Sequence, residues 1–135
     1  MGDETEPIED DELLYRRIDL PEYYDPQEGP DLSPHAFHPR QHDRTGISFY
    51  RARYFTPEQV ARRGRRNRYY IAVLRAGDIR ASGLAIAPRT EGHQLGHVEL
   101  PGLKHENRRS NAGQEAEQLL ARKLCLKILG PFDSI

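Results

Sequence analysis

The residues of this chain best suited to chemistry are arginines gathered between positions 51 and 68. One acid, Glu58, accompanies them, and Tyr69 and Tyr70 follow directly. Guanidinium groups bind phosphates and carboxylates, and tyrosine rings can stack on nucleobases. We therefore predict a basic binding face, the alternative being an exposed, solvated loop and outer helix surface. The residues of this face are Arg51, Arg53, Arg62, Arg63, Arg65, Arg66, Arg68 and Tyr69.

Three histidines, His35, His38 and His42, follow one another at spacings of three and four. On a continuous helix this spacing would place three imidazoles on one face, as a metal site requires. Pro39 interrupts such a helix, and no cysteine or acid completes a recognised ligand spacing. We therefore predict polar loop histidines and no metal.

The single cysteine, Cys125, excludes an intrachain disulfide framework and suits a reducing cytosol. No motif that activates a nucleophile surrounds it, so we expect a small core residue. Phosphate-binding glycine loops, nucleophile elbows and paired-cysteine spacings are absent from the sequence.

The elements that position the basic face are the best specified in the chain. The pattern predicts a strand over Ile47–Tyr54, a short helix over Pro57–Arg63, a basic loop over Gly64–Arg68 and a buried strand over Tyr69–Leu74. The last of these is continuously apolar, which is typical of a strand covered on both sides.

The start of the short helix carries three agreeing signals. Thr56 and Gln59 have the spacing of a capping box, in which each side chain accepts a hydrogen bond from the other's backbone. Pro57 occupies the first helical position, where its missing N–H costs nothing. Phe55 and Val60 form a hydrophobic-staple pair. We predict that the helix begins here.

The rest of the chain predicts an α+β fold. In a first strand, Leu13–Ile18, alternation would place Leu14, Arg16 and Ile18 on one face and Leu13, Tyr15 and Arg17 on the other, which leaves open which arginine faces inward. An arginine that points with apolar neighbours needs a polar partner or a wet cleft. We expect five or six short strands in a small mixed or antiparallel sheet, short capped helices and one C-terminal helix. Further elements are expected at a one-turn helix capped by Ser33, a single turn capped by Asp78, strands over Leu84–Ala87 and Gly96–Leu100, a helix over Ala112–Lys123, and Leu124–Leu129 as a last strand or the helix end.

Charge divides the chain into two parts. Residues 1–12 hold seven of the 21 acids and no Lys or Arg, so 14 acids face 20 basic residues in the remainder, a net charge of +6. We predict a disordered acidic leader over residues 1–12, either a solvated tail or a mask over the basic face, and a single α+β domain over residues 13–135.

Composition excludes several classes of protein. The 135 residues are 36% hydrophobic and 30% charged, which suits one small domain with polar tails. Nothing approaches the roughly 20 apolar residues of a membrane span, and the N-terminus lacks the pattern of a signal peptide. We therefore expect a cytoplasmic protein with no membrane contact.

Two phrases, Leu14–Tyr15–Arg16 and Gly46–Ile47–Ser48–Phe49–Tyr50–Arg51–Ala52, resemble the small ADP-ribosyltransferase-like domains of bacterial conflict systems. That family orders a first-strand Arg or His, a second-strand Ser, Thr or Tyr and a late-strand Glu around NAD. The resemblance implies that Arg16 holds a pyrophosphate or ribose, that Ser48 or Tyr50 shapes the nicotinamide pocket, and that Glu99 engages the ribose. His97 stands where the family has Gln or Glu two residues before that glutamate.

The phrases Leu13–Ile18, Leu74–Gly83 and Gly96–Leu100 also resemble small bacterial proteins without an assigned activity, which implies a bacterial, cytosolic origin. No RNA-binding, zinc-finger or helix-turn-helix pattern accompanies the arginines. We expect a non-enzymatic binding module that uses its Arg-rich face on an acidic protein or nucleic acid, without a cofactor. The alternative is an ADP-ribosyltransferase-like enzyme that uses NAD.

Overall fold

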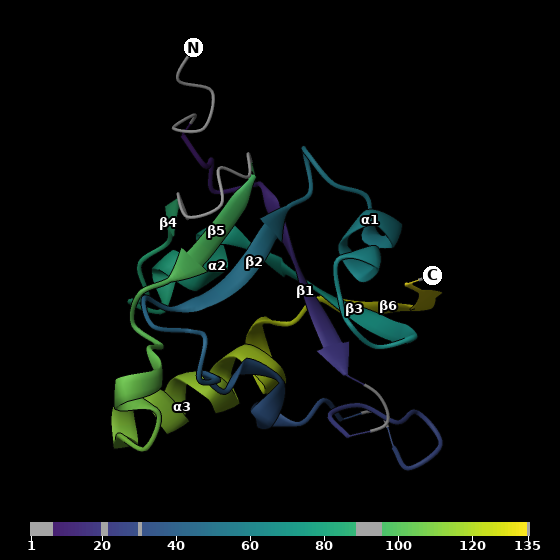
Figure 1. Ribbon diagram of the computed structural model, residues 1–135. Helices are drawn as coiled ribbons and strands as arrows, with labels where there is room; N and C mark the ends of the chain where they lie inside the picture. Colours follow the sequence, from purple (N-terminus) through teal and green to yellow (C-terminus); the bar gives the residue numbers. More distant parts are fainter. Residues whose placement is uncertain (1–6, 20–21, 30, 89–95, 135) are drawn as a thin grey trace.

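Six strands form one antiparallel sheet in the order β4-β5-β2-β1-β3-β6 in the computed structural model (Figure 1). The structure describes residues 7–19, 22–29, 31–88 and 96–134. The predicted α+β class, with an antiparallel sheet, is confirmed. The strands are β1 (Leu13–Asp19), β2 (Ile47–Arg51), β3 (Arg68–Arg75), β4 (Ala87–Pro88), β5 (His97–Leu100) and β6 (Lys127–Asp133).

The central strand, β1, pairs with β2 on one side and along its whole length with β3 on the other, from Leu13 opposite Arg75 to Asp19 opposite Tyr69. Alternation along β1 places Leu14, Arg16 and Ile18 on one face, as the sequence predicted, and this face points into the larger core. The prediction of a buried strand at Tyr69–Leu74 is also confirmed, because β3 has neighbours on both sides and Ile71, Ala72, Val73 and Leu74 are fully buried.

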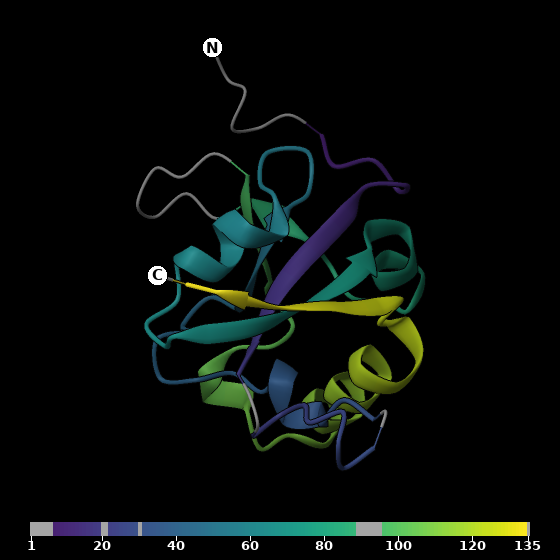
Figure 2. The same cartoon turned by 90° about the vertical axis from the view of Figure 1, so that its right-hand side faces the viewer.

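Short helices cover both faces of the sheet. The helix α1 (Pro57–Arg62) lies against β1, β3 and β6, where Val60 and Ala61 are fully buried beside Tyr50, Tyr69 and Ile71 (Figure 2). The opposite face holds the larger core. The other helical elements are the 3-10 helices η2 (Pro34–Phe37) and η4 (His105–Asn107), α2 (Ala76–Ala81), α3 (Asn111–Leu119) and the π-helical turn η5 (Leu120–Leu124).

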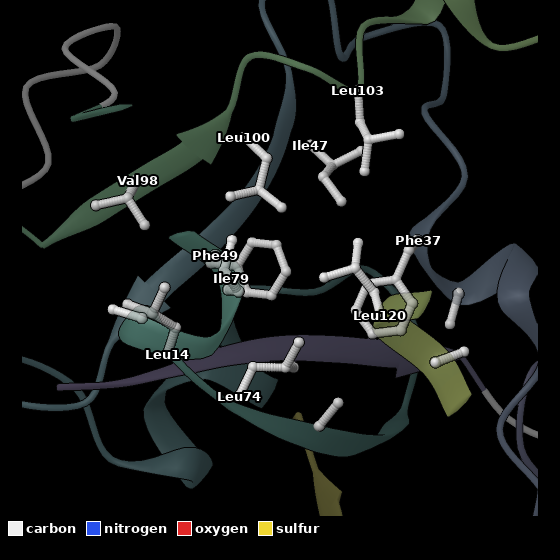
Figure 3. Packing of buried hydrophobic residues seen from close by; sticks show 14 of the residues in the cluster. Leu14, Phe37, Ile47, Phe49, Leu74, Ile79, Val98, Leu100, Leu103 and Leu120 are labelled. Atoms are coloured by element: carbon white, nitrogen blue, oxygen red, sulfur yellow. The ribbon is translucent and has the colours of Figure 1, made fainter. Parts of the chain in front are cut away.

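The larger core joins residues that are far apart in the sequence. Phe37 of η2, Ile79 of α2 and Leu120 of η5 meet the inner face of the sheet (Figure 3). Each fully buried side chain of this size contributes roughly 1.5–3 kcal/mol by leaving water. The sheet contributes Leu14, Ile47, Phe49, Leu74, Val98 and Leu100 to the same cluster.

Several element boundaries differ from the sequence prediction. The second strand ends at Arg51 rather than Tyr54, because the N–H groups of Tyr54 and Phe55 turn back to the Arg51 carbonyl oxygen. Helix α2 begins directly after Arg75, so Asp78 lies inside the first turn. Contrary to the sequence prediction, Asp78 does not cap the helix but forms an ion pair with Arg75. Strand β4 contains only Ala87 and Pro88.

The C-terminal region also departs from the expected ranges. Helix α3 is capped by the Ser110 hydroxyl, which accepts a hydrogen bond from the Gly113 N–H at 3.0 Å. The helix continues through the π-helical turn η5 to Leu124. The last strand starts later than predicted, at Lys127, and runs to Asp133.

Residues 7–12 lie on the domain, although the sequence predicted a disordered leader over residues 1–12. Ile8 is buried in the larger core. The backbone oxygens of Asp10 and Glu12 accept hydrogen bonds from Gly77 and Ala76 at the start of α2. Residues 1–6 of the predicted leader lie outside the described part of the chain.

Candidate anion-binding face

The helix start at Thr56 sets the position of the predicted basic face. The Thr56 hydroxyl accepts the Gln59 N–H at 3.2 Å, and the Gln59 side-chain oxygen accepts the Thr56 N–H at 2.8 Å, so the capping box is confirmed. A six-residue helix is too short to be stable alone. The buried Val60 and Ala61 hold it on the sheet, and its outer side turns Arg62 and Arg63 toward solvent.

Three arginines of the predicted face are engaged with acids from elsewhere in the chain. Arg51 is buried, and its guanidinium donates hydrogen bonds to both carboxylate oxygens of Glu12, at 2.5 and 2.7 Å. Arg66 forms ion pairs with Glu22 at 2.9 Å and with Asp19 at 3.4 Å. Arg68 pairs with Asp133 at 2.9 Å. Exposed ion pairs add little stability, but they neutralise these positive charges.

The remaining positive charge is concentrated at the end of α1 and in the loop that follows. Arg62, Arg63 and Arg65 are exposed and form no ion pair with any acid among the residues that the structure describes. Arg53 is also exposed, and its guanidinium lies over the Tyr54 ring at 5.6 Å. The charges of Arg62, Arg63 and Arg65 attract anions and concentrate them at the surface.

A hollow of about 290 Å³ opens at this charged end of α1. Two half-buried aromatic rings, Tyr54 and Phe55, line it with Gln59, Arg62 and Arg63. The Arg63 guanidinium lies 4.9 Å from the centre of the Phe55 ring, so ring and cation form adjacent walls. The hollow therefore offers cations, an amide and flat apolar surfaces together.

Beneath the hollow, an aromatic cluster surrounds Tyr50. The Phe55 ring meets Tyr50 edge-on at 5.1 Å, and the His97 ring stacks on Tyr50 at 4.6 Å. The Arg17 guanidinium lies over Tyr50 at 5.5 Å and over Tyr69 at 5.7 Å. Aromatic and cation–π contacts of this kind each contribute about 0.5–1.5 kcal/mol. The cluster fixes the ring of Phe55 at the floor of the face.

Tyr69 was predicted as a binding residue and is instead part of this support. Its ring is buried, with 4% of its surface exposed, and its hydroxyl accepts the Arg66 N–H at 2.9 Å. Arg17 was not among the predicted site residues. It lies on the same face, and its guanidinium donates to the Tyr50 hydroxyl and to the Val60 carbonyl oxygen, each at 3.3 Å. Its place opposite Arg16 in the alternation of β1 was the only sequence signal.

The residues implied by the NAD resemblance lie on both sides of the sheet. Arg16 faces the larger core, between the rings of Phe37 and Phe49, and donates to the carbonyl oxygens of Ala36 at 2.7 Å and Ser48 at 2.9 Å. Burial lowers the pKa of Arg16 to about 10, so it stays charged at neutral pH. Its contacts tie η2 to β2 rather than line a surface.

Ser48, Tyr50 and Glu99 lie on the other side, together with Arg17. Ser48 is directly opposite Glu99 in the pairing of β2 with β5. The Glu99 carboxylate is buried and accepts a hydrogen bond from the Thr45 hydroxyl at 2.9 Å. The sheet thus brings three of the four implied residues together and separates Arg16 from them.

The histidines are engaged in separate contacts. His38 Nδ1 lies 2.9 Å from the buried carboxylate of Glu117, which connects η2 to α3. His42 approaches Asp43 at 3.7 Å. Within the described ranges, no group of three side chains is arranged to hold a metal ion.

A second hollow, of about 310 Å³, lies where η5 meets β6. Cys125 lines it together with Asp31, Arg122 and Lys127. The thiol is half-buried, and burial raises its pKa above the ordinary cysteine value. Cys125 therefore has little thiolate character at neutral pH.

Comparison of the chain with protein-family models, with curated proteins and with solved structures found no match. Among the described helices, none has both the length and the apolar character that crossing a membrane requires.

Proposed function

We propose that this protein is a small binding module whose Arg-rich face engages an acidic partner, either an acidic protein or a nucleic acid. One observation carries the proposal: Arg62, Arg63 and Arg65 are exposed together without an acid partner in the described chain, while Arg51, Arg66 and Arg68 are each paired. Cations left unpaired on a face that also holds aromatic rings favour binding of a polyanion.

Two matched variants test this function. The double variant Arg62→Gln/Arg65→Gln removes two unpaired charges, whereas Arg68→Gln/Arg80→Gln removes two charges that are paired with Asp133 and Asp10. Both change the net charge equally. The binding of two fluorescein-labelled 20-mers, oligothymidylate and polyglutamate, is measured by anisotropy at several salt concentrations.

We expect the wild-type protein to bind at least one of these probes at low salt. The Arg62/Arg65 variant should weaken binding and lower the slope of log affinity against log salt, by roughly 0.7 for each lost phosphate contact. The Arg68/Arg80 variant should bind nearly as the wild type does. Equal losses in the two variants, or no binding of either probe at low salt, would contradict the proposal.

A second candidate function is an ADP-ribosyltransferase-like reaction with NAD. The observation that favours it is the position of Ser48 directly opposite Glu99, on the face that also holds Tyr50 and Arg17. A buried carboxylate there can stabilise positive charge that develops on a ribose during cleavage of its glycosidic bond. Calorimetric titration with NAD tests it: we expect heat that disappears in Glu99→Gln, and no heat at millimolar NAD would exclude it.

A further inference from the structure

The hollow beside α1 is more than a charged surface. Its lining combines the Tyr54 and Phe55 rings with the Gln59 amide and the Arg62 and Arg63 guanidinium groups. The acidic side chains of a peptide supply carboxylates for the arginines but no flat ring for the aromatic walls. A nucleotide supplies both, because its phosphate is an anion and its base has a π-face. We propose that this hollow is a base-stacking subsite for single-stranded nucleic acid.

The proposal rests on the proposed binding function and names its partner. The hollow, of about 290 Å³, lies just below the range of about 300–1,000 Å³ for small-ligand sites, so we expect it to take a group no larger than about one nucleotide. In a duplex the base faces are stacked on one another, so a base must be unpaired to enter. A single strand is therefore the matching partner.

Each side chain of the lining has a separate part in the proposed contact. Arg62 and Arg63 are exposed lining residues, which a backbone phosphate would meet. Gln59 uses its side-chain oxygen in the helix cap, which leaves its amide N–H groups to donate to base carbonyl oxygens. Arg65 lies beyond the hollow in the next loop and extends the positive charge along the path of a strand.

The walls of the hollow are held in place before any ligand arrives. The Phe55 ring is held by an edge contact with Tyr50 and by the Arg63 guanidinium, which lies over it. The Tyr54 ring is flanked by the guanidinium groups of Arg51, at 5.1 Å, and Arg53, at 5.6 Å. Rings that are already ordered lose little conformational entropy on binding, which favours affinity.

The experiment compares two anionic ligands that differ only in their bases. One is a fluorescein-labelled 20-mer of thymidylate, and the other is a 20-mer of abasic phosphodiester units with the same charge. We expect the wild-type protein to bind the thymidylate strand about 5- to 150-fold more tightly, the range that one stacked base contributes. The double variant Tyr54→Leu/Phe55→Leu should lose this preference and bind both strands with the affinity of the abasic one.

Phe132→Leu is the matched control, because it removes a half-buried ring from the same side of the sheet outside the hollow. It should keep the preference for bases. Leucine at position 55 retains an apolar partner for Val60, and circular dichroism checks that each variant is folded. Duplex DNA of the same length should bind more weakly than the thymidylate strand.

The outcomes separate this inference from the function on which it rests. If the wild type binds the abasic strand and the thymidylate strand equally, the stacking subsite is refuted while polyanion binding stands. The same holds if the preference survives in Tyr54→Leu/Phe55→Leu. If neither strand nor polyglutamate binds at low salt, the binding function itself fails and the subsite fails with it.

Discussion

The ion pair between Glu12 and Arg51 attaches residues 7–12 to the domain, and its removal gives a sharp test of that attachment. Both side chains are almost fully buried, with 8% and 3% of their surfaces exposed, and the two N–O distances are 2.5 and 2.7 Å. Arg51 also donates to the carbonyl oxygen of Pro7 at 3.2 Å. Removing one partner of a buried ion pair costs about 3–5 kcal/mol.

Glu12→Gln should fall at the lower end of that range, near 3 kcal/mol, because the amide keeps one oxygen for the guanidinium. Domains of this size are stable by about 5–15 kcal/mol, so the loss is a large part of the total. It corresponds to a fall in Tm of roughly 10 °C. The assay is urea unfolding followed by circular dichroism, with Tm from a thermal scan.

Glu9→Gln is the control, since Glu9 is exposed and the structure gives its side chain no ion pair within the described residues. It should change stability by less than about 0.5 kcal/mol. The apolar double variant Glu12→Leu/Arg51→Met should be more stable than either single variant, because no lone charge remains buried. A loss below about 1 kcal/mol in Glu12→Gln would show that residues 7–12 do not hold this pair in solution.

Two further predictions concern the backbone at Gly46 and the thiol of Cys125. Gly46→Ala should destabilise the fold by about 2 kcal/mol or more, because Gly46 has a φ of +139° and an added Cβ would clash with the carbonyl of Leu100. Gly83→Ala is the control: Gly83 has a φ of +97° but open space around it, so this variant should lose less stability in the same urea assay. Alkylation of Cys125 by iodoacetamide should be slower at pH 8 than in the urea-unfolded chain and should accelerate at higher pH, because burial raises the thiol pKa and the thiolate is the nucleophile. Equal rates in the folded and unfolded chain would refute this reading of Cys125.

The sequence predicted those helix starts and strands that are determined by residues close together in the chain. The capping box at Thr56 and the apolar strand before Arg75 are formed by residues close together in the chain, and both are present. Alternation grouped Arg16 with Leu14 and Ile18 but did not decide whether Arg16 or Arg17 faces inward, and the structure buries Arg16. The end of the second strand at Arg51 was not predicted, because the alternating pattern continues to Tyr54 although the chain turns after Arg51, where Tyr54 and Phe55 bond back to the Arg51 carbonyl oxygen.

The composition of the basic face shows the same limit. The sequence grouped the arginines of the basic face together. It did not show that Glu22 pairs with Arg66 and that Asp133 pairs with Arg68. The prediction of a disordered leader treated its acids only as mutually repelling charges. Nothing in the sequence indicated that Ile8 is buried in the larger core or that Glu12 forms an ion pair with Arg51.

The order of strands in the sheet also governs how this chain folds. Leu14 pairs with Leu74, so the central strands meet only after a loop of some sixty residues has closed. Leu120, near the C-terminus, completes the larger core, and β6 adds the outer edge next to β3. Contacts this distant make folding slow. During synthesis, the inner face of the sheet therefore stays uncovered until Leu120 has left the ribosome, and a chain cut before Leu120 should aggregate rather than fold.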